Sequence, residues 1–122
     1  MKTEPARRRV LLADDNRDAA DSLALLLSIE GHEVRVAYGG AAALSLAQSF
    51  RPEVALLDIG MPDVDGYQVA RALRATPWGA DIVLIALTGW GQEEDKRRAV
   101  EAGFNAHLTK PVEVEQIRKL LP

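Results

Sequence analysis

Four short apolar runs, separated by segments with helical patterns, constrain the fold of this chain more than any other feature. The runs occupy residues 10–13, 54–57, 82–87 and 106–109. Each is followed at once by residues that can do chemistry, which are in chain order Asp14 with Asp15, Asp58, Thr88 and Lys110. Sites in open α/β sheets form outside the carboxyl ends of the strands. If these runs pair in parallel, three carboxylates, a hydroxyl and an ammonium group therefore meet at one sheet edge.

The segments between the runs predict helices. Asn16 is suited to cap a helix that runs to Glu30, and Gly31 is suited to follow its end. Further helices are predicted over residues 40–50, 67–75, 92–102 and 112–121. In the last of these, an apolar stripe is expected to face the core, and it consists of Val114, Ile117, Leu120 and Leu121.

A fifth strand is predicted over residues 33–37, where apolar and polar side chains alternate. Alternation indicates a half-exposed strand at a sheet edge, whereas the first, third and fourth strands are apolar throughout and belong in the centre. With right-handed crossovers, the pattern predicts the α/β fold class. The architecture is a flavodoxin-like (βα)5 doubly wound parallel sheet with strand order 2-1-3-4-5.

Length and composition indicate one soluble domain. We expect a single domain over residues 1–122, with a core at about 7–121 and a polar extension at 1–6. The net charge of −3 gives no footprint for nucleic acid, and the absence of cysteine excludes disulfides and thiolate metal sites. No apolar stretch approaches the roughly 18 residues that span a bilayer. These features predict a cytoplasmic domain without membrane contact.

Three carboxylates at one edge repel one another, so at least one of their pKa values is expected to rise. A hard divalent cation offsets this repulsion, and Mg²⁺ typically takes one or two carboxylates and shares phosphate oxygens. A carboxylate can also act as a nucleophile that forms an aspartyl phosphate. Lys110 is then placed to neutralise charge on a transferring phosphoryl group, and Thr88 to donate a hydrogen bond to it.

In combination, these residues resemble the receiver domains of two-component response regulators. The successive intervals, from Asp15 to Asp58, from Asp58 to Thr88 and from Thr88 to Lys110, are 43, 30 and 22 residues, which is the spacing of that family. The loop after Asp58 and the dipeptides after the last two strands match as well, through Met61-Pro62, Asp65-Gly66, Thr88-Gly89 and Lys110-Pro111. The segments around Thr88 and Lys110 look most like receivers of hybrid sensor histidine kinases.

The resemblance implies a phosphoacceptor signalling domain of a phosphorelay. Asp58 would take a phosphoryl group from a partner phosphohistidine, and Lys110 would contact that group. Mg²⁺ (or Mn²⁺) would be bound by Asp15, Asp58 and the backbone carbonyl of Gly60, with Asp14 acting mainly through water. Thr88 would be the switch hydroxyl.

The implied partners are a histidine kinase or phosphotransfer domain and a downstream output domain or protein. The sequence does not predict the oligomeric state. The resemblance also implies a cis peptide bond between Lys110 and Pro111.

Three positions depart from the family pattern. His107 stands where many receivers carry the Tyr or Phe that rotates with the switch hydroxyl, so its part in switching is an open alternative. Gly60 offers no side chain two residues after the acceptor, and Trp90 is bulky two residues after Thr88. Because nothing here orients an attacking water, we expect the aspartyl phosphate to hydrolyse slowly.

Three other functions fit these residues less well than a phosphoacceptor. A phosphohydrolase needs an acid two residues after its nucleophile, where this chain has Gly60. A flavodoxin-like cofactor binder needs a phosphate loop rich in Gly, Ser or Thr, where this chain has Asp14-Asp15-Asn16. An unphosphorylated docking module has no need for acidic residues at these positions. The sequence therefore predicts a domain that is not a turnover enzyme.

Overall fold

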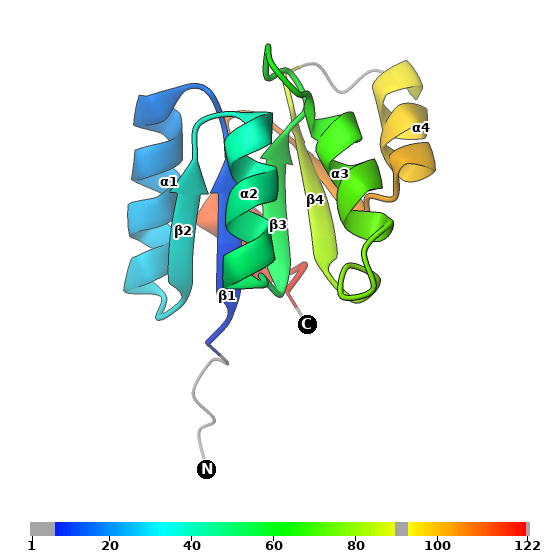
Figure 1. Ribbon diagram of the computed structural model, residues 1–122. Coiled ribbons are helices and arrows are strands. Elements are labelled where there is room, and N and C mark those ends of the chain that lie inside the picture. The colour runs from blue at the N-terminus through cyan, green and yellow to red at the C-terminus, as the bar shows by residue number, and fades with distance from the viewer. Residues whose placement is uncertain (1–6, 90–92, 122) are drawn as a thin grey trace.

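The structure is a computed structural model that describes residues 7–89 and 93–121 (Figure 1). Its strands form one parallel sheet in the predicted order, β2-β1-β3-β4-β5. They span β1 Arg9–Ala13, β2 Glu33–Ala37, β3 Val54–Asp58, β4 Val83–Thr88 and β5 Ala106–Thr109. The fold is the predicted flavodoxin-like α/β class. The extension at residues 1–6 lies outside the described residues.

In the described ranges five helices cover the sheet, and Figure 1 shows helices packed on its two faces. They span α1 Arg17–Ile29, α2 Gly40–Phe50, α3 Gly66–Arg74, α4 Glu93–Ala102 and α5 Val114–Arg118. Buried side chains of α2, α3 and α4 share one apolar cluster with the sheet, and those of α1 and α5 share the other. The fold is therefore a three-layer α/β/α sandwich.

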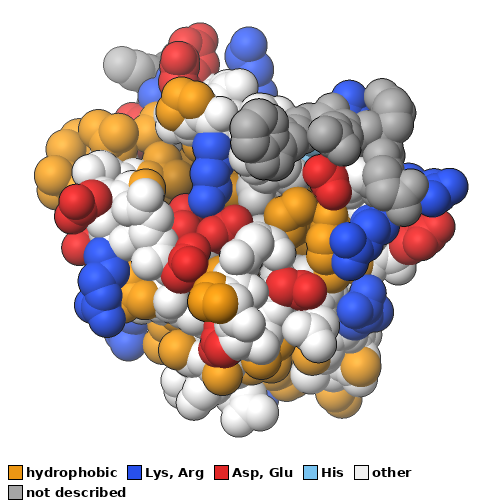
Figure 2. Space-filling model, turned by 90° about the horizontal axis from the view of Figure 1, so that it is seen from above, with side chains coloured by type: hydrophobic (Ala, Val, Ile, Leu, Met, Phe, Trp, Pro, Cys, Tyr) orange, Lys and Arg blue, Asp and Glu red, His pale blue; other side chains and the backbone are white. Residues whose placement is uncertain are grey.

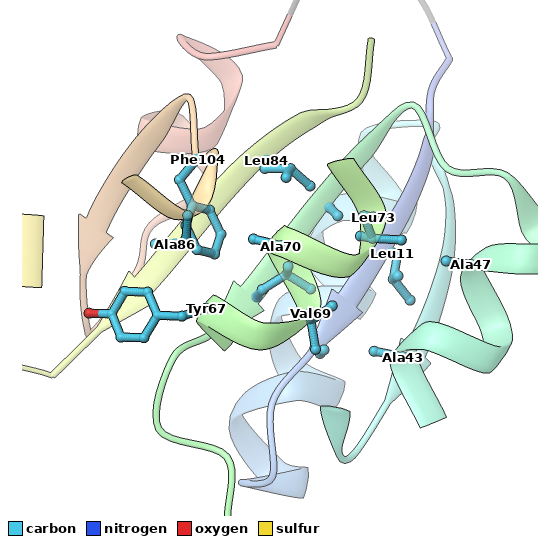
Figure 3. Close-up of a cluster of buried hydrophobic side chains, with 14 of the residues drawn as sticks. Leu11, Ala43, Ala47, Tyr67, Val69, Ala70, Leu73, Leu84, Ala86 and Phe104 are labelled. Carbon is cyan, nitrogen blue, oxygen red and sulfur yellow. The ribbon is translucent and has the colours of Figure 1, made fainter. Parts of the chain in front are cut away.

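The strand side chains alternate between the two apolar clusters. In β1, Leu11 and Ala13 belong to the cluster under α2 and α3, whereas Val10 and Leu12 belong to the cluster under α1 and α5. All four side chains are fully buried. Because both faces are covered, a central strand has no polar position, which explains why its sequence is apolar throughout. Figure 3 shows part of the first cluster around Leu11, between the sheet and the two helices.

Local capping contacts determine where α1 and α3 begin and where α1 ends. The side chain of Asn16 accepts the N–H of Ala19 at 3.1 Å, and Gly31 follows α1 with a φ of 100°. The side chain of Asp65 caps α3, and Gln68 accepts the N–H of Asp65 in return. The cap at Asn16 and the glycine after α1 confirm the prediction, while α3 begins one residue before its predicted start.

The prediction for the last helix was wrong in extent, because α5 covers Val114–Arg118 rather than residues 112–121. Glu113 is extended and its N–H donates to the side chain of Gln116, so the helix cannot begin earlier. The predicted apolar stripe is confirmed, since Ile117 is buried and Val114, Leu120 and Leu121 pack against the same cluster. The predicted helix start at Gln92 lies outside the described residues.

Arg74 joins the end of α3 to two loops at the far side of the sheet. Its guanidinium donates to the carbonyls of Gly79, Ile82 and Gly103 and to the side chain of Asn105, at 2.7–3.0 Å. These contacts fix the C-terminal end of α4.

No helix within the described ranges is long and apolar enough to cross a bilayer.

His32 fastens the segment before β1 to the turn before β2. Its side chain is buried, and its Nδ1 accepts the backbone N–H of Arg8 at 3.1 Å. Burial lowers the pKa of His32, the charge of Arg8 lowers it further, and the charge of Glu30 opposes the shift. The fold therefore requires the neutral imidazole.

We predict that acid weakens the fold through His32. A group with a lowered folded pKa contributes stability above its unfolded pKa, near 6.5, and loses it as the pH falls through the folded value. Between pH 7.5 and 5.5, the unfolding free energy of the wild type should therefore fall by about 1 kcal/mol more than that of His32→Gln. This difference is the contribution of roughly one hydrogen bond. Urea titrations at both pH values measure this. Identical profiles for His32→Gln and the wild type would contradict the role of His32.

Candidate functional site

The five residues that follow or end the strands lie together at one edge of the sheet. Asp14 and Asp15 follow β1, Asp58 ends β3, Thr88 ends β4 and Lys110 follows β5. The strands β1 and β3 are neighbours in register, with Ala13 opposite Leu57, so the residues after these two partners are adjacent. Figure 2 looks down on this edge and shows acidic side chains gathered near its middle with a basic side chain beside them.

The three carboxylates form a candidate metal site. Asp14, Asp15 and Asp58 each offer a carboxylate oxygen, and these oxygens lie within 4.8 Å of one another. Asp14 and Asp58 are buried, whereas Asp15 is exposed. Oxygen ligands in such a group suit a hard cation such as Mg²⁺. The cluster that the strand ends predicted is therefore present.

Backbone amides hold the two buried carboxylates in place. Asp14 Oδ1 accepts the N–H of Asn16 at 3.0 Å, and Asp58 Oδ1 accepts the N–H of Gly60 at 2.9 Å. Gly66, the first residue of α3, packs against the backbone of Asp58, and a Cβ there would lie 2.7 Å from the Asp58 carbonyl oxygen. The start of α3 thus limits where Asp58 can sit.

Lys110 bridges the two buried carboxylates. Its Nζ lies 3.0 Å from Asp14 Oδ2 and 3.3 Å from Asp58 Oδ2. Burial by itself lowers the pKa of Lys110, but the contacts with the two carboxylates outweigh it and raise that pKa. Burial also raises the pKa of Asp14, with a smaller contribution from the charge of Asp58, although the Asn16 N–H and Lys110 oppose it. One carboxyl pKa is raised, as expected, but burial is the main cause and repulsion between the carboxylates is a minor one.

Thr88 provides a hydroxyl that lacks a protein partner. The residue is 2% exposed, and among the described residues nothing accepts from or donates to its Oγ1. A buried polar group without a hydrogen bond costs about 1–3 kcal/mol. The carbonyl of Thr88 accepts the N–H of Lys110 at 2.7 Å, which ties the two strand ends together. The hydroxyl is therefore available to a ligand oxygen at this edge.

The positions that depart from the family pattern are only partly described. His107 lies in β5 beside Ala86 and is half-buried. At Gly60, an added Cβ would meet only Asp58 Oδ1, at 3.6 Å, so there is room for a side chain. The Lys110–Pro111 bond is cis, as predicted. Trp90 lies outside the described residues.

Two features of the site were missed by sequence reasoning. Asp63, in the loop after β3, accepts the N–H groups of Gly40 and Ala41 at 3.1 Å and so caps α2 from a distance. The absence of a capping side chain at Gly39 is the one sequence signal for this contact. Tyr67 and Arg98 line a cavity with Asp58, and nothing in the sequence brings these residues together.

Comparison with known proteins agrees with the geometry. The sequence matches the response regulator receiver domain family over residues 10–122. It is 37% identical to an uncharacterized 14.6 kDa protein of Leptolyngbya boryana, covering 95% of this chain and 88% of that protein. It is also 35% identical to the DNA-binding dual master transcriptional regulator RpaA of Synechocystis, covering 89% of this chain but only 45% of RpaA.

A solved structure shows the same fold. It is the receiver domain of the sensor histidine kinase PA1611 from Pseudomonas aeruginosa, with a magnesium ion coordinated in its active site cleft. The two chains are 31% identical with a TM-score of 0.84, and the match covers 94% of this chain and 95% of the other. With the acidic cluster, the lysine and the threonine on this fold, the chain belongs to the response regulator receiver domains of two-component systems.

Proposed function

We propose that this chain accepts a phosphoryl group on Asp58 from a phosphohistidine of a histidine kinase or phosphotransfer domain. The observation that carries the proposal is the environment of Asp58, a buried carboxylate with Lys110 at 3.3 Å and two further carboxylates close by. In the transfer, a carboxylate oxygen of Asp58 forms a bond to phosphorus. The nitrogen–phosphorus bond of the donor breaks, and its imidazole leaves as the neutral ring after taking up a proton.

The residues around Asp58 fit a bound Mg²⁺ (or Mn²⁺). Asp15 and Asp58 would hold the cation directly with the carbonyl of Gly60, and Asp14 would act mainly through water. When bound, the cation supplies positive charge that offsets the carboxylates and the phosphoryl oxygens. Lys110 adds a second positive charge beside Asp14 and Asp58, and its raised pKa keeps it protonated at neutral pH.

Phosphorylation would act as a switch. A phosphoryl group brings about −1.5 to −2 charge and three strong acceptor oxygens. The Thr88 hydroxyl, buried and without a protein partner in the described ranges, is suited to donate to one of these oxygens. A shift of Thr88 toward the phosphoryl group would change the conformation of the surface near β4 and α4. A downstream output domain or protein would recognise that change. His107 has a half-buried position on the neighbouring strand β5, opposite Ala86.

Turnover chemistry is disfavoured by Gly60. A phosphohydrolase that forms an aspartyl phosphate needs an acid or base to assist the leaving group and the attacking water. The position two residues after Asp58 has no side chain, and the space beside it is open. We therefore propose a phosphoacceptor that assists its own phosphorylation and slow dephosphorylation, rather than an enzyme with turnover.

The protein donor is expected to dock beside α1. Leu26 on this helix lines a cavity of about 470 Å³ with Asp14, Lys110 and Pro111. Leu25 and Ile29 on the same helix are 62% and 72% exposed. These side chains offer apolar surface to a partner helix whose histidine reaches Asp58.

We further propose that the whole chain is one domain that acts in the cytoplasm, without contact to nucleic acid or membrane.

We predict that a phosphoryl donor modifies Asp58 alone. With Mg²⁺ present, acetyl phosphate should change tryptophan fluorescence, because Trp90 follows Thr88 by two residues. Radiolabelled acetyl phosphate should label the wild type, and Asp58→Asn should lose both responses, with label at least about 100-fold lower because the nucleophile is gone. Asp18→Asn removes a carboxylate in the first turn of α1 instead and should keep both responses. Labelling that persists in Asp58→Asn would refute the proposal.

We predict that Mg²⁺ stabilises the fold through the acidic cluster. A ligand at 100 times its Kd adds about 2.7 kcal/mol to the unfolding free energy, so saturating Mg²⁺ should raise the Tm of the wild type clearly. Asp15→Asn removes a ligand that is exposed and makes no ion pair with Lys110, so it should reduce the Mg²⁺ shift with little change in the metal-free Tm. Asp18→Asn is again the control, and an undiminished shift in Asp15→Asn would argue against this metal site.

We predict a long-lived aspartyl phosphate that a side chain at residue 60 shortens. Gly60→Asn places an amide beside Asp58 in open space, where it can orient a water for attack. The half-life of the labelled protein, measured after removal of the donor in Mg²⁺ buffer, should fall by about tenfold or more. Gly60→Ala adds volume without a polar group and should keep the slow rate. A wild-type half-life of seconds would contradict the prediction.

A further inference from the structure

The cavity beside Asp58 has a second wall that the proposed transfer does not use. The cavity measures about 430 Å³ and lies between the strand ends and the facing sides of α3 and α4. Asp58 and Lys110 line it on the sheet side, and Tyr67, Asp95 and Arg98 line it on the helix side. Its volume falls within the range of small-ligand pockets. Any small donor that enters it meets both walls.

Tyr67 forms a rigid platform in the helix wall. The residue is 3% exposed, and its ring packs edge to face with Phe104 at a centroid distance of 6.4 Å. Figure 3 shows the two rings side by side at the end of the apolar cluster, with the Tyr67 hydroxyl directed away from it. That hydroxyl donates to the backbone carbonyl of Asp95 at 3.4 Å. The position of the ring is thus fixed from two sides.

Arg98 lies on this platform, and within the described residues its donors have no protein acceptor. Its guanidinium carbon is 4.2 Å from the centre of the Tyr67 ring, a cation–π distance. In the part of the chain that the structure describes, its N–H groups donate to no protein acceptor. Arg51, by contrast, lies 4.3 Å over Trp78 and donates its Nε–H to the carbonyl of Gln48. Arg98 is therefore a positioned guanidinium whose planar donor set remains free for phosphate oxygens.

The charge of Arg98 also matters because Asp95 lines the same cavity. Without Arg98, the described lining of the cavity would hold two carboxylates, Asp58 and Asp95, with Lys110 as its one cation. A phosphoryl donor carries negative charge, so such a cavity would repel it. With Arg98 in place, the approach to Asp58 has a cation on each side.

We propose that Arg98 is a donor-binding residue, which contacts the phosphoryl oxygens of a small anionic donor before transfer to Asp58. The inference rests on the proposed function. For acetyl phosphate as donor, an oxygen of Asp58 forms a bond to phosphorus, the bond between phosphorus and the acetyl oxygen breaks, and acetate leaves with the electron pair. Arg98 and Lys110 then bind the phosphoryl oxygens from opposite sides of the cavity.

The test measures second-order labelling rates of the full chain with two donors, acetyl phosphate and phosphoimidazole, at saturating Mg²⁺. Arg98→Gln should lower the rate about tenfold with both donors, the loss expected for one charge-assisted hydrogen bond. Arg98→Lys should lie between Arg98→Gln and the wild type, because it keeps the charge and loses the planar donor set. A loss with acetyl phosphate alone would place Arg98 on the leaving group and overturn the proposal.

A matched variant separates this role from a structural one. Arg51→Gln removes a cation from another arginine–aromatic stack, one that is not part of the cavity lining. This variant should label at the wild-type rate. Arg98→Gln should also keep the wild-type Tm and its Mg²⁺ shift.

Two further outcomes decide the matter. Equal labelling of Arg98→Gln and the wild type would overturn the role of Arg98 while leaving the phosphoacceptor intact. A wild type that takes no label from either donor would refute the phosphoacceptor, and the donor-binding role with it.

Discussion

The contact of Lys110 with two buried carboxylates is the interaction on which the functional edge of this domain depends. Removing two carboxylates from water is costly unless a cation and hydrogen bonds compensate. Lys110 lies within 3.3 Å of both, and the N–H groups of Asn16 and Gly60 satisfy one oxygen of each. The same arrangement leaves the edge rich in negative charge and open to a cation and a phosphoryl group. The repulsion between the two carboxylates is therefore offset by a single side chain, that of Lys110.

The loops around this edge are fixed by side chains that act as caps. Asp65 caps the helix that follows its own loop, while Asp63 reaches across to the start of α2. The N–H of Val64 is the largest cause that holds the pKa of Asp63 below its usual range, and the N–H groups of Ala41 and Gly40 lower it further. These contacts order the loop after β3 without using Asp58, whose second oxygen remains turned to Lys110. Within one short segment, Asp63 and Asp65 thus stabilise helix ends, while Asp58 faces Lys110 in the candidate site.

The wall of the cavity formed by α3 and α4 uses its charged side chains in a different way. Tyr67 belongs to the apolar core and yet supports Arg98 at the surface. Arg74, at the other end of α3, uses its guanidinium for several backbone carbonyls and fixes the loops there. The two arginines differ because protein carbonyls accept from Arg74, whereas within the described residues no protein group accepts from Arg98. Fixed structure at one end of α3 and α4 is thus combined with an available cation at the other.

The sequence by itself determined the sheet order, the central strands and the five strand-end residues, because burial on both faces forces apolar runs and parallel strands bring their ends together. It also determined the caps at Asn16 and Gly31 and the apolar stripe of the last helix, since these depend on neighbours within a few residues. Only the tertiary structure decided the length of α5, the capping of α2 by Asp63 and the stacking of Arg98 on Tyr67. Each of these depends on contacts between segments or on competing local bonds, which no periodicity or local spacing in the sequence records.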